Sequence, residues 1–190
     1  RRVLFRSDSL ADDAIIYGYA GASTIGHEIT HGFDDEGRQF DAKGNLNNWW
    51  LKQDEAAFKK KADVYVEQFN NYVVLDSMHV NGKASLGENI ADLGGVTIGL
   101  EAFKKTEQYK KGEKIGGLTP VQRFFLGYSL SWMINYRPEA LANQVMSDVH
   151  APVTLRVNGP LSNTPEFYEA FGVKEGDAMW RADSIRVSIW

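Results

Sequence analysis

The sequence predicts a mainly α-helical fold, and three observations support this prediction. Three long stretches, residues 11–33, 49–75 and 86–103, contain no proline and repeat apolar residues at helical spacing. Two of the five prolines directly follow a threonine, which is the pattern of an N-cap and the first residue of a helix. The chain has 190 residues, of which 43% are hydrophobic, and this is enough for one domain with a sizeable core.

The first predicted helix covers residues 11–33 and contains four glycines. Each glycine costs a helix about 1 kcal/mol relative to alanine, so we interpret these residues as points where a neighbouring helix packs closely. Residues 34–48 are rich in Gly, Asp and Asn and predict a loop. Within this loop, the turn sequence at 41–45 allows a small β-hairpin between Phe40 and Leu46.

Charged and apolar residues interleave from Trp49 to about Leu75, which predicts a long amphipathic helix. We expect the Trp49-Trp50 pair at its start to lie in the core. A further helix is predicted from Leu86 through Phe103, where apolar residues again follow helical spacing.

Thr119 and Pro120 are predicted to open a strongly apolar helix that ends before Pro138. A shorter helix is predicted from Glu139 to Val149. Most apolar residues of the first of these helices are expected in the core, namely Phe124, Phe125, Leu126, Tyr128, Leu130, Trp132, Met133 and Ile134.

The last part of the chain contains more turn signals. Residues 150–152 break the preceding helix, and residues 153–157 predict a short extended segment. The Asn-Gly-Pro sequence at 158–160 predicts a turn into a final helix that begins near Thr164. There is no internal repeat and no domain boundary, so we expect one domain.

Composition excludes several function classes. A formal net charge of -4 and a pI near 5.6 argue against a nucleic-acid partner. No apolar stretch approaches the roughly 20 residues that span a bilayer, so we expect no membrane contact from this segment. The chain has no cysteine, which leaves nitrogen and oxygen as the only metal donors. Residues 1–10 do not continue into the first helical pattern and are interpreted as a scar or an unstructured end.

The strongest chemical signal is His27-Glu28-Ile29-Thr30-His31, which has the pattern His-Glu-x-x-His. On a helix that turns about 100° per residue, His27 and His31 share a face and can bind one metal ion. Glu28 lies beside that face, where it can reach a water on the metal and act as a base. The alternative is a solvated amphipathic helix in which the two histidines are incidental.

A catalytic zinc site takes three protein ligands, so a third donor is needed. Glu88 and Asp92 are also four residues apart in a predicted helix and therefore share a face. Glu88 would complete the ligand set, and Asp92 would accept the free ring N–H of a ligand histidine. The alternative makes Glu88 an acidic residue that the helix dipole favours and leaves Asp92 facing solvent.

These two motifs, the Asp34-Asp35 pair, Trp49-Trp50 and the tail around His150 and Arg156 resemble the neprilysin family of zinc metalloendopeptidases, including its bacterial oligoendopeptidase O-like members. The resemblance covers nearly the whole chain after the first ten residues, and the motifs occur in order at compatible spacings. It implies a gluzincin-type catalytic domain in which the HExxH helix and the ExxxD helix meet at one zinc ion per chain.

The resemblance also implies a role for each site residue in the hydrolysis of a peptide substrate. Glu28 would be the general base, His150 would stabilise the oxyanion, and Arg156 would bind a backbone carbonyl of the peptide. Asp34 and Asp92 would support the ligand histidines, and Asp92 is often assigned a proton-donor role in the family. The implied zinc ligands are His27, His31 and Glu88.

Members of this family are several times longer than this chain. The resemblance therefore implies that residues 11–190 are the carboxy-terminal part of a catalytic domain and that the amino-terminal cap domain is absent. The missing portion is expected as a partner, and the isolated fragment is expected to be weakly active or inactive. The lack of cysteine favours a bacterial relative, with a periplasmic or surface location preferred to the cytoplasm. Two rival functions remain, a non-catalytic binding module on the same fold and a structural helical domain without zinc.

Overall fold

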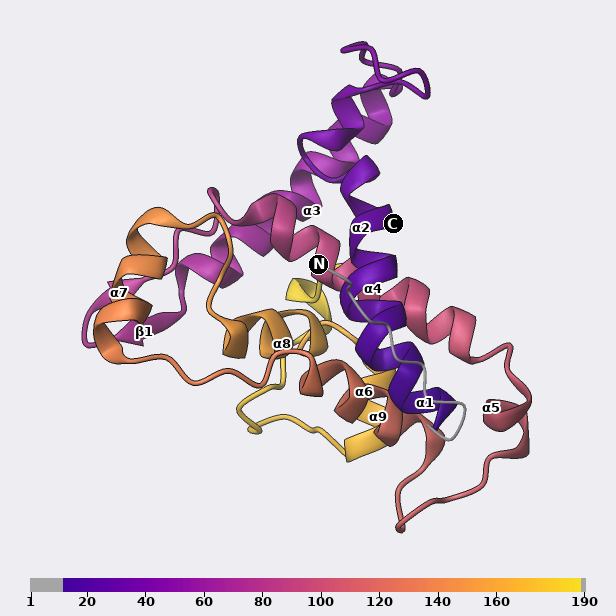
Figure 1. The fold of residues 1–190 in the computed structure, drawn as a ribbon. Coiled ribbons are helices and arrows are strands. Elements are labelled where there is room, and N and C mark those ends of the chain that lie inside the picture. The colour runs from indigo at the N-terminus through magenta and orange to yellow at the C-terminus, as the bar shows by residue number, and fades with distance from the viewer. Residues whose placement is uncertain (1–11, 189–190) are drawn as a thin grey trace, which may run out of the picture.

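The computed structural model describes residues 12–188, so the expected scar at residues 1–10 lies outside the described residues. The described chain is mainly helical, which confirms the predicted fold class (Figure 1). In chain order, the elements are α1 (Asp13–Ile16), η1 (Tyr17–Gly26), α2 (His27–Thr30), η2 (His31–Phe33), η3 (Gly37–Gln39), α3 (Lys52–Asn70), β1 (Val73–Leu75), β2 (Met78–His79), α4 (Leu86–Phe103), α5 (Glu107–Lys111), α6 (Pro120–Leu130), α7 (Pro138–Ser147), α8 (Val153–Leu161), α9 (Pro165–Phe171) and η4 (Asp183–Ile185).

The elements α1, η1, α2 and η2 form one continuous helix, which we call the first helix. It begins at Asp12, whose side chain accepts a hydrogen bond from the Ala14 amide at 3.0 Å. Its middle, η1, is wound as a π-helix, and its end, η2, is wound as a 3₁₀-helix. The helix predicted for residues 11–33 is thus confirmed over its described part, although its sequence does not predict the π-helical winding. Such windings occur often at functional sites, and this one leads directly into His27.

Two glycines explain how closely the first helix packs. A β-carbon at Gly18 would lie 2.6 Å from the backbone nitrogen of Tyr128 in α6, and one at Gly26 would lie 2.9 Å from the Cα of Gly95 in α4. Protein interiors are too densely packed to absorb such an overlap without moving a backbone. The predicted close packing is therefore confirmed at these two positions, and it brings α4 against the start of α2. It is wrong for Gly21 and Gly32, where an added β-carbon would meet only Tyr17 of the same helix or nothing within 4 Å.

The loop after the first helix and the start of α3 extend away from the body of the molecule (Figure 1). Phe40 and Leu46 form one antiparallel bridge, so the predicted turn is present but no strands extend from it. Trp50 packs edge-on against Phe58 with ring centroids 5.4 Å apart. The prediction that both tryptophans lie in the core is wrong for Trp49, which is 50% exposed and donates its indole N–H to the carbonyl of Phe40.

The long helix α3 ends at Asn70, earlier than the predicted end at Leu75. The residues that follow form β1, which pairs antiparallel with β2 and places Val73 opposite His79. β-branched residues favour strands, and Asp76 makes the turn between the strands with a φ of +45°. Among residues 12–188, this hairpin is the only sheet, and it lies between α3 and α4 along the chain.

Helix α6 begins as predicted, because Thr119 ahead of the helix and Gln122 in its first turn form a reciprocal capping box. It ends at Leu130, earlier than predicted, and an irregular segment leads to α7, which is close to its predicted bounds. The expected burial is confirmed for Phe124, Phe125 and Tyr128. The same expectation is wrong for Leu126, Leu130, Met133 and Ile134, which are exposed.

The largest correction concerns α8, because the predicted extended segment at 153–157 and the predicted turn at 158–160 are one helix. Pro160 lies inside this helix and has no N–H to bond with the carbonyl of Arg156, four residues earlier. The hydroxyl of Tyr128 donates to that carbonyl instead, at 2.8 Å. A contact from a distant helix therefore lets α8 continue through a residue that usually ends a helix.

Two hydrophobic clusters pack against α4, one along its first half and the other along its second half, and α4 contributes buried side chains to both. One joins α3 and α4 and includes Phe58, Tyr65, Phe69, Ile90 and Leu93. The other joins the first helix, α4 and α6 and includes Val96, Leu100, Phe103, Phe124 and Tyr128. The final helix α9 is close to its predicted start. Within residues 12–188, no helix combines the length and apolar character needed to cross a membrane.

Candidate metal centre

Helices α2 and α4 approach each other at glycines, and this brings the two predicted motifs together. A β-carbon at Gly95 would lie 2.9 Å from the amide nitrogen of His27, and one at Gly94 would lie 2.5 Å from the side chain of Thr30. Because Gly94 and Gly95 have no side chain, the two backbones can pack closely. His27 and His31 on the first helix therefore contact Glu88, which lies in the first turn of α4.

Three potential metal donors converge between the two helices. The Nε2 atoms of His27 and His31 lie 3.0 Å apart. They lie 3.2 and 3.5 Å, respectively, from the two carboxylate oxygens of Glu88. One ligand atom from each residue can be chosen so that all three lie within 4.8 Å of one another. Two imidazole nitrogens and a carboxylate oxygen form a donor set of catalytic zinc sites, so the residues present fit a zinc ion.

A carboxylate holds the second ring nitrogen of each histidine. The Nδ1 atom of His27 lies 2.9 Å from Oδ1 of Asp92, and the Nδ1 atom of His31 lies 2.7 Å from Oδ2 of Asp34. Asp34 itself accepts hydrogen bonds from two backbone amides that follow it, at 2.9 and 2.7 Å. This arrangement keeps the proton on Nδ1 and leaves Nε2 free to bind a metal.

The electrostatics of the cluster favour a cation at its centre. Burial lowers the pKa of His27, but hydrogen bonds to Asp92 and Glu88 outweigh burial and raise the pKa from 6.5 to about 9. Burial raises the pKa of Glu88, but its contacts with His27, His150 and Arg156 bring it below the ordinary value. A proton on His27 therefore occupies the place that a metal ion would take, and metal binding would release it.

His150 reaches the cluster from the loop before α8. Its Nε2 atom lies 3.3 Å from Oε2 of Glu88. Asp148 accepts hydrogen bonds from the backbone N–H of His150, at 2.9 Å, and from its Nδ1, at 2.7 Å. Sequence reasoning missed Asp148, although a local signal was present, because an Asp side chain commonly bonds the backbone two residues later.

Arg156 closes the cluster from α8 and is 8% exposed. Its Nε donates to Oδ2 of Asp92 at 2.8 Å, and its Nη2 donates to Oδ1 of the same carboxylate at 2.9 Å. The alternative in which Asp92 faces solvent is wrong, because Asp92 is 1% exposed. Trp132 also contacts Arg156, with the Cζ atom 4.1 Å from the ring centroid, and no sequence pattern pointed to this pair.

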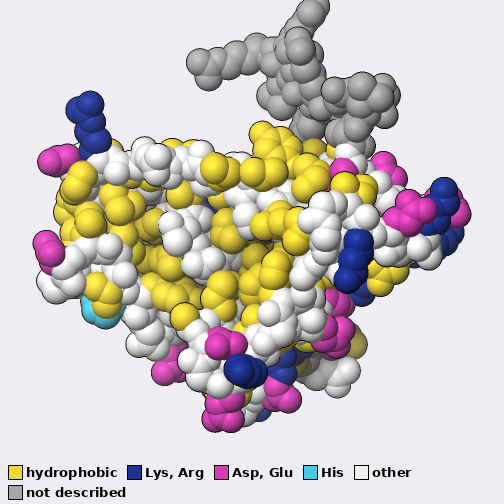
Figure 2. Space-filling view, turned by 90° about the horizontal axis from the view of Figure 1, so that it is seen from below, with side chains coloured by type: hydrophobic (Ala, Val, Ile, Leu, Met, Phe, Trp, Pro, Cys, Tyr) yellow, Lys and Arg dark blue, Asp and Glu magenta, His cyan; other side chains and the backbone are white. Residues whose placement is uncertain are grey.

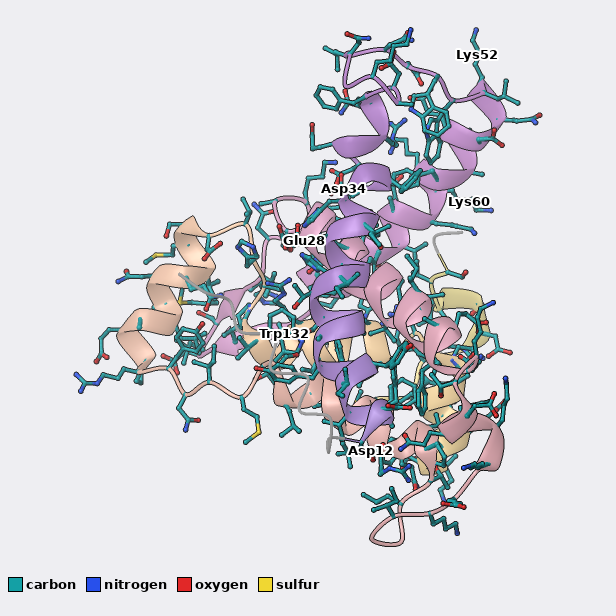
Figure 3. The ribbon with its side chains drawn as sticks, turned by 45° about the vertical axis from the view of Figure 1, so that its right-hand side comes forward. Asp12, Glu28, Asp34, Lys52, Lys60 and Trp132 are labelled. Carbon is teal, nitrogen blue, oxygen red and sulfur yellow. The ribbon has the colours of Figure 1, made fainter. Side chains whose placement is uncertain are left out.

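Glu28 follows His27 directly on the first helix, and its side chain is exposed. Figure 3 shows Glu28 and Trp132 on the same side of this helix. The other predicted site residues belong to one network of contacts, formed by His27, His31, Asp34, Glu88, Asp92, His150 and Arg156.

The sequence matches the model of Peptidase family M13 over residues 5–187. The neutral endopeptidase of Lactobacillus helveticus is 41% identical over 174 residues, which cover 92% of this chain and 25% of that protein. The endothelin-converting enzyme homolog of Locusta migratoria is 45% identical over 166 residues, which cover 86% of this chain and 23% of that protein. The chain thus spans about a quarter of the length of these curated relatives.

Two solved structures share the fold. The zinc metalloprotease Zmp1 of Mycobacterium tuberculosis, in complex with an inhibitor, has a TM-score of 0.88 and 38% identity over 95% of this chain and 28% of that chain. PepO from Lactobacillus rhamnosis has a TM-score of 0.83 and 37% identity over 95% of this chain and 27% of that chain. Family model, sequence relatives and fold therefore agree over most of the chain, which belongs to peptidase family M13, the neprilysin family.

Proposed function

We propose that this chain carries the catalytic centre of a zinc-dependent endopeptidase that hydrolyses internal bonds of oligopeptides. The observation that carries the proposal is the convergence of His27, His31 and Glu88 with Glu28 directly after the first ligand. A non-catalytic binding module would need neither a base at Glu28 nor His150 beside the metal ligands. A purely structural helical domain would have no use for two histidines and a carboxylate in contact.

One zinc ion per chain would be held by His27, His31 and Glu88. When bound there, zinc supplies a Lewis acid that polarises a carbonyl oxygen and lowers the pKa of water from about 15.7 toward roughly 7. Asp34 and Asp92 would keep the two histidines in the tautomer that presents Nε2 to the metal.

The residues of the protein would move the proton and hold the peptide. The Glu28 carboxylate would accept a proton from the attacking water and pass it to the leaving amine. His150, which Asp148 orients, would donate a hydrogen bond to the oxygen that becomes negative during the attack. The Nη1 atom of Arg156 makes no hydrogen bond within residues 12–188, so it can donate to a backbone carbonyl of the peptide.

Asp92 would act through its neighbours. It is 1% exposed, and its two oxygens already accept hydrogen bonds from His27 and Arg156. These contacts favour a supporting role over direct proton donation to a substrate.

The amino-terminal portion of the same protein is the partner we propose. The chain spans about a quarter of its relatives' length, and Figure 2 shows hydrophobic side chains gathered over one hollowed face. Large exposed apolar side chains include Tyr19, Ile25, Ile29, Phe33, Met133 and Ile134. Exposed apolar surface of this extent is typical of an interface. A location outside the cytoplasm stays a prediction.

Zinc content tests the metal centre. The wild type is expected to hold one zinc ion per chain, and His27→Ala and Glu88→Ala are each expected to lose it. His79→Ala is a matched control, because His79 lies on β2 and bonds the carbonyl of Asn70 away from the cluster. A folded wild type that takes up no zinc when supplied with the metal would overturn the proposal.

The Glu28→Gln variant tests the chemistry separately. It should keep zinc and lose peptide hydrolysis, because glutamine has nearly the same shape but cannot accept the proton. Cleavage of an internally quenched peptide should be measured for this chain and for a longer chain that includes the amino-terminal portion. Hydrolysis at the wild-type rate by the zinc-loaded variant would show that Glu28 is not the base.

A further inference from the structure

The guanidinium of Arg156 lies over the indole ring of Trp132. Its Cζ atom is 4.1 Å from the ring centroid, whereas the other cation–π pairs among the described residues are 5.0 to 5.5 Å apart. Arg156 is 8% exposed, so water screens this contact little. Cation–π attraction is strongest where the pair is desolvated and where the ring is tryptophan.

This contact restrains a motion that the other contacts of Arg156 leave open. Asp92 accepts hydrogen bonds from Nε and Nη2, which hold the guanidinium along one edge and within its own plane. Nη2 also donates to Oε2 of Glu88 at a longer 3.3 Å, and the Tyr128 hydroxyl holds the backbone carbonyl of Arg156. These contacts lie at the Nε–Nη2 edge or at the backbone, and the face of Trp132 restrains the guanidinium from tilting about that edge.

A tilt of Arg156 would reach the metal centre through Asp92. The Oδ1 atom of Asp92 contacts both Nη2 of Arg156 and Nδ1 of His27, each at 2.9 Å. If Arg156 moves, this oxygen loses one of its two partners, and the hydrogen bond that orients His27 changes with it. Carboxylates that orient ligand histidines control metal affinity.

The indole of Trp132 offers a larger flat face than phenylalanine or leucine would. Its Nε1 atom is buried and lies beside the hydroxyl of Tyr128. The feature that tryptophan adds is the large π face, which is the surface that Arg156 contacts.

We propose that Trp132 is a positioning residue of the metal centre. Its indole face holds Arg156 flat against Asp92, and Asp92 in turn holds His27 in the orientation that binds the metal. The role in metal binding rests on the proposed zinc centre, whereas the contact between Trp132 and Arg156 exists without a metal.

Zinc affinity, measured by competition with a chromophoric chelator, tests this role. Trp132→Leu keeps apolar bulk but removes the π face, so its affinity is expected to fall on the order of tenfold. Trp132→Phe keeps a π face and should retain most of the affinity. Met133→Ala, at the adjacent and 76% exposed position, is the matched control and should bind as the wild type does. Equal affinities for the leucine and phenylalanine variants would overturn the proposal.

A double-mutant cycle shows whether Trp132 acts through Arg156. In an Arg156→Gln background, Trp132→Leu should cause no further loss of zinc affinity, because the cation that it holds is gone. Additive losses would overturn the proposal. A wild type that binds no zinc would overturn the metal centre itself, whereas zinc binding that is insensitive to Trp132→Leu would overturn only the role of Trp132.

Fluorinated tryptophan provides a test that does not depend on the folding of a variant. Fluorine weakens the ring quadrupole with little change in size, so zinc affinity should fall as the number of fluorines increases. The Trp132→Phe variant, grown with the same fluorinated tryptophans, should show no such trend. A wild-type affinity that is independent of fluorination would contradict the role of the π face.

Discussion

The ring of His27 and the carboxylate of Asp92 lie 2.9 Å apart although 65 residues separate them in the chain. Their contact joins α2 to α4, and the bond from Arg156 to the same carboxylate adds α8. Asp92 is 1% exposed, so it can hold this position only because both partners satisfy its charge. The candidate metal centre is therefore built on the packing of three helices.

Asp92→Asn is expected to weaken zinc binding by about 10- to 100-fold. Asparagine keeps the size of the side chain but loses the charge that holds His27 and Arg156. Competition titration against a chelator measures the change. Asp63→Asn is the matched control, because Asp63 is exposed and pairs with Lys59 on α3. Equal zinc affinity in the two variants would contradict the role given to Asp92.

The stability of the metal-free chain should fall as the pH rises from neutral. Burial lowers the pKa of His27, but Asp92 and Glu88 raise it from 6.5 to about 9. Because the folded state binds this proton more tightly, the stabilisation is complete below pH 6.5 and is lost as the pH rises through about 9. The slope cannot exceed about 1.4 kcal/mol per pH unit for one proton.

Urea unfolding across this pH range, with a chelator present, measures that slope. The His27→Gln variant should lack it, since glutamine does not titrate. Saturating zinc should also remove it, because the metal takes the place of the proton. A free energy of unfolding that rises between neutral pH and pH 9 would contradict the direction of the shift.

Gly95→Ala should destabilise the fold by about 1–3 kcal/mol, as overpacking does. The added carbon would lie 2.9 Å from the His27 amide nitrogen and would overlap the carbonyl oxygen of Ala22. In Gly32→Ala, at the end of the first helix, the added carbon meets nothing within 4 Å. This second variant should be neutral or up to about 1 kcal/mol more stable. Chemical denaturation of both variants makes the comparison, and equal free energies of unfolding would contradict the close approach of the helices.

The composition of the site could be predicted because its signals are local. His27 and His31 share a face by helical spacing, and so do Glu88 and Asp92, whichever fold surrounds them. The contact of Trp132 with Arg156 has no such signal, since it depends on how the segment after α6 packs against α8. Spacing within one helix cannot indicate contacts between helices.

In the fold as well, elements set by nearby residues could be predicted, whereas elements that depend on distant contacts could not. The capping box at Thr119 marks the start of α6 because it involves residues within one turn. The helical state of residues 153–161 depends on Tyr128, a partner elsewhere in the chain, and the sequence pattern gave it incorrectly. A tertiary contact overrides local preference there.

Tyr128→Phe is expected to cost about 1–3 kcal/mol, because it leaves a buried carbonyl without a donor. Pro160 provides no N–H for the carbonyl of Arg156, and the Tyr128 hydroxyl bonds that carbonyl at 2.8 Å. Burial keeps the pKa of Tyr128 well above its ordinary value of 10, so the hydroxyl stays protonated and remains a donor.

Pro160→Ala supplies the missing N–H at position 160, which can donate to the carbonyl four residues earlier. In the Tyr128→Phe background, Pro160→Ala should therefore recover part of the lost free energy of unfolding. As a single substitution it should give no gain, because proline restricts the unfolded chain and its removal lowers stability. Urea unfolding of the wild type, the two single variants and the double variant measures the coupling. If the two changes in free energy of unfolding add, the N–H at position 160 does not replace the Tyr128 hydroxyl as donor. Because the backbone of Arg156 carries the side chain that holds Asp92, zinc affinity should show the same loss in Tyr128→Phe and the same recovery in the double variant.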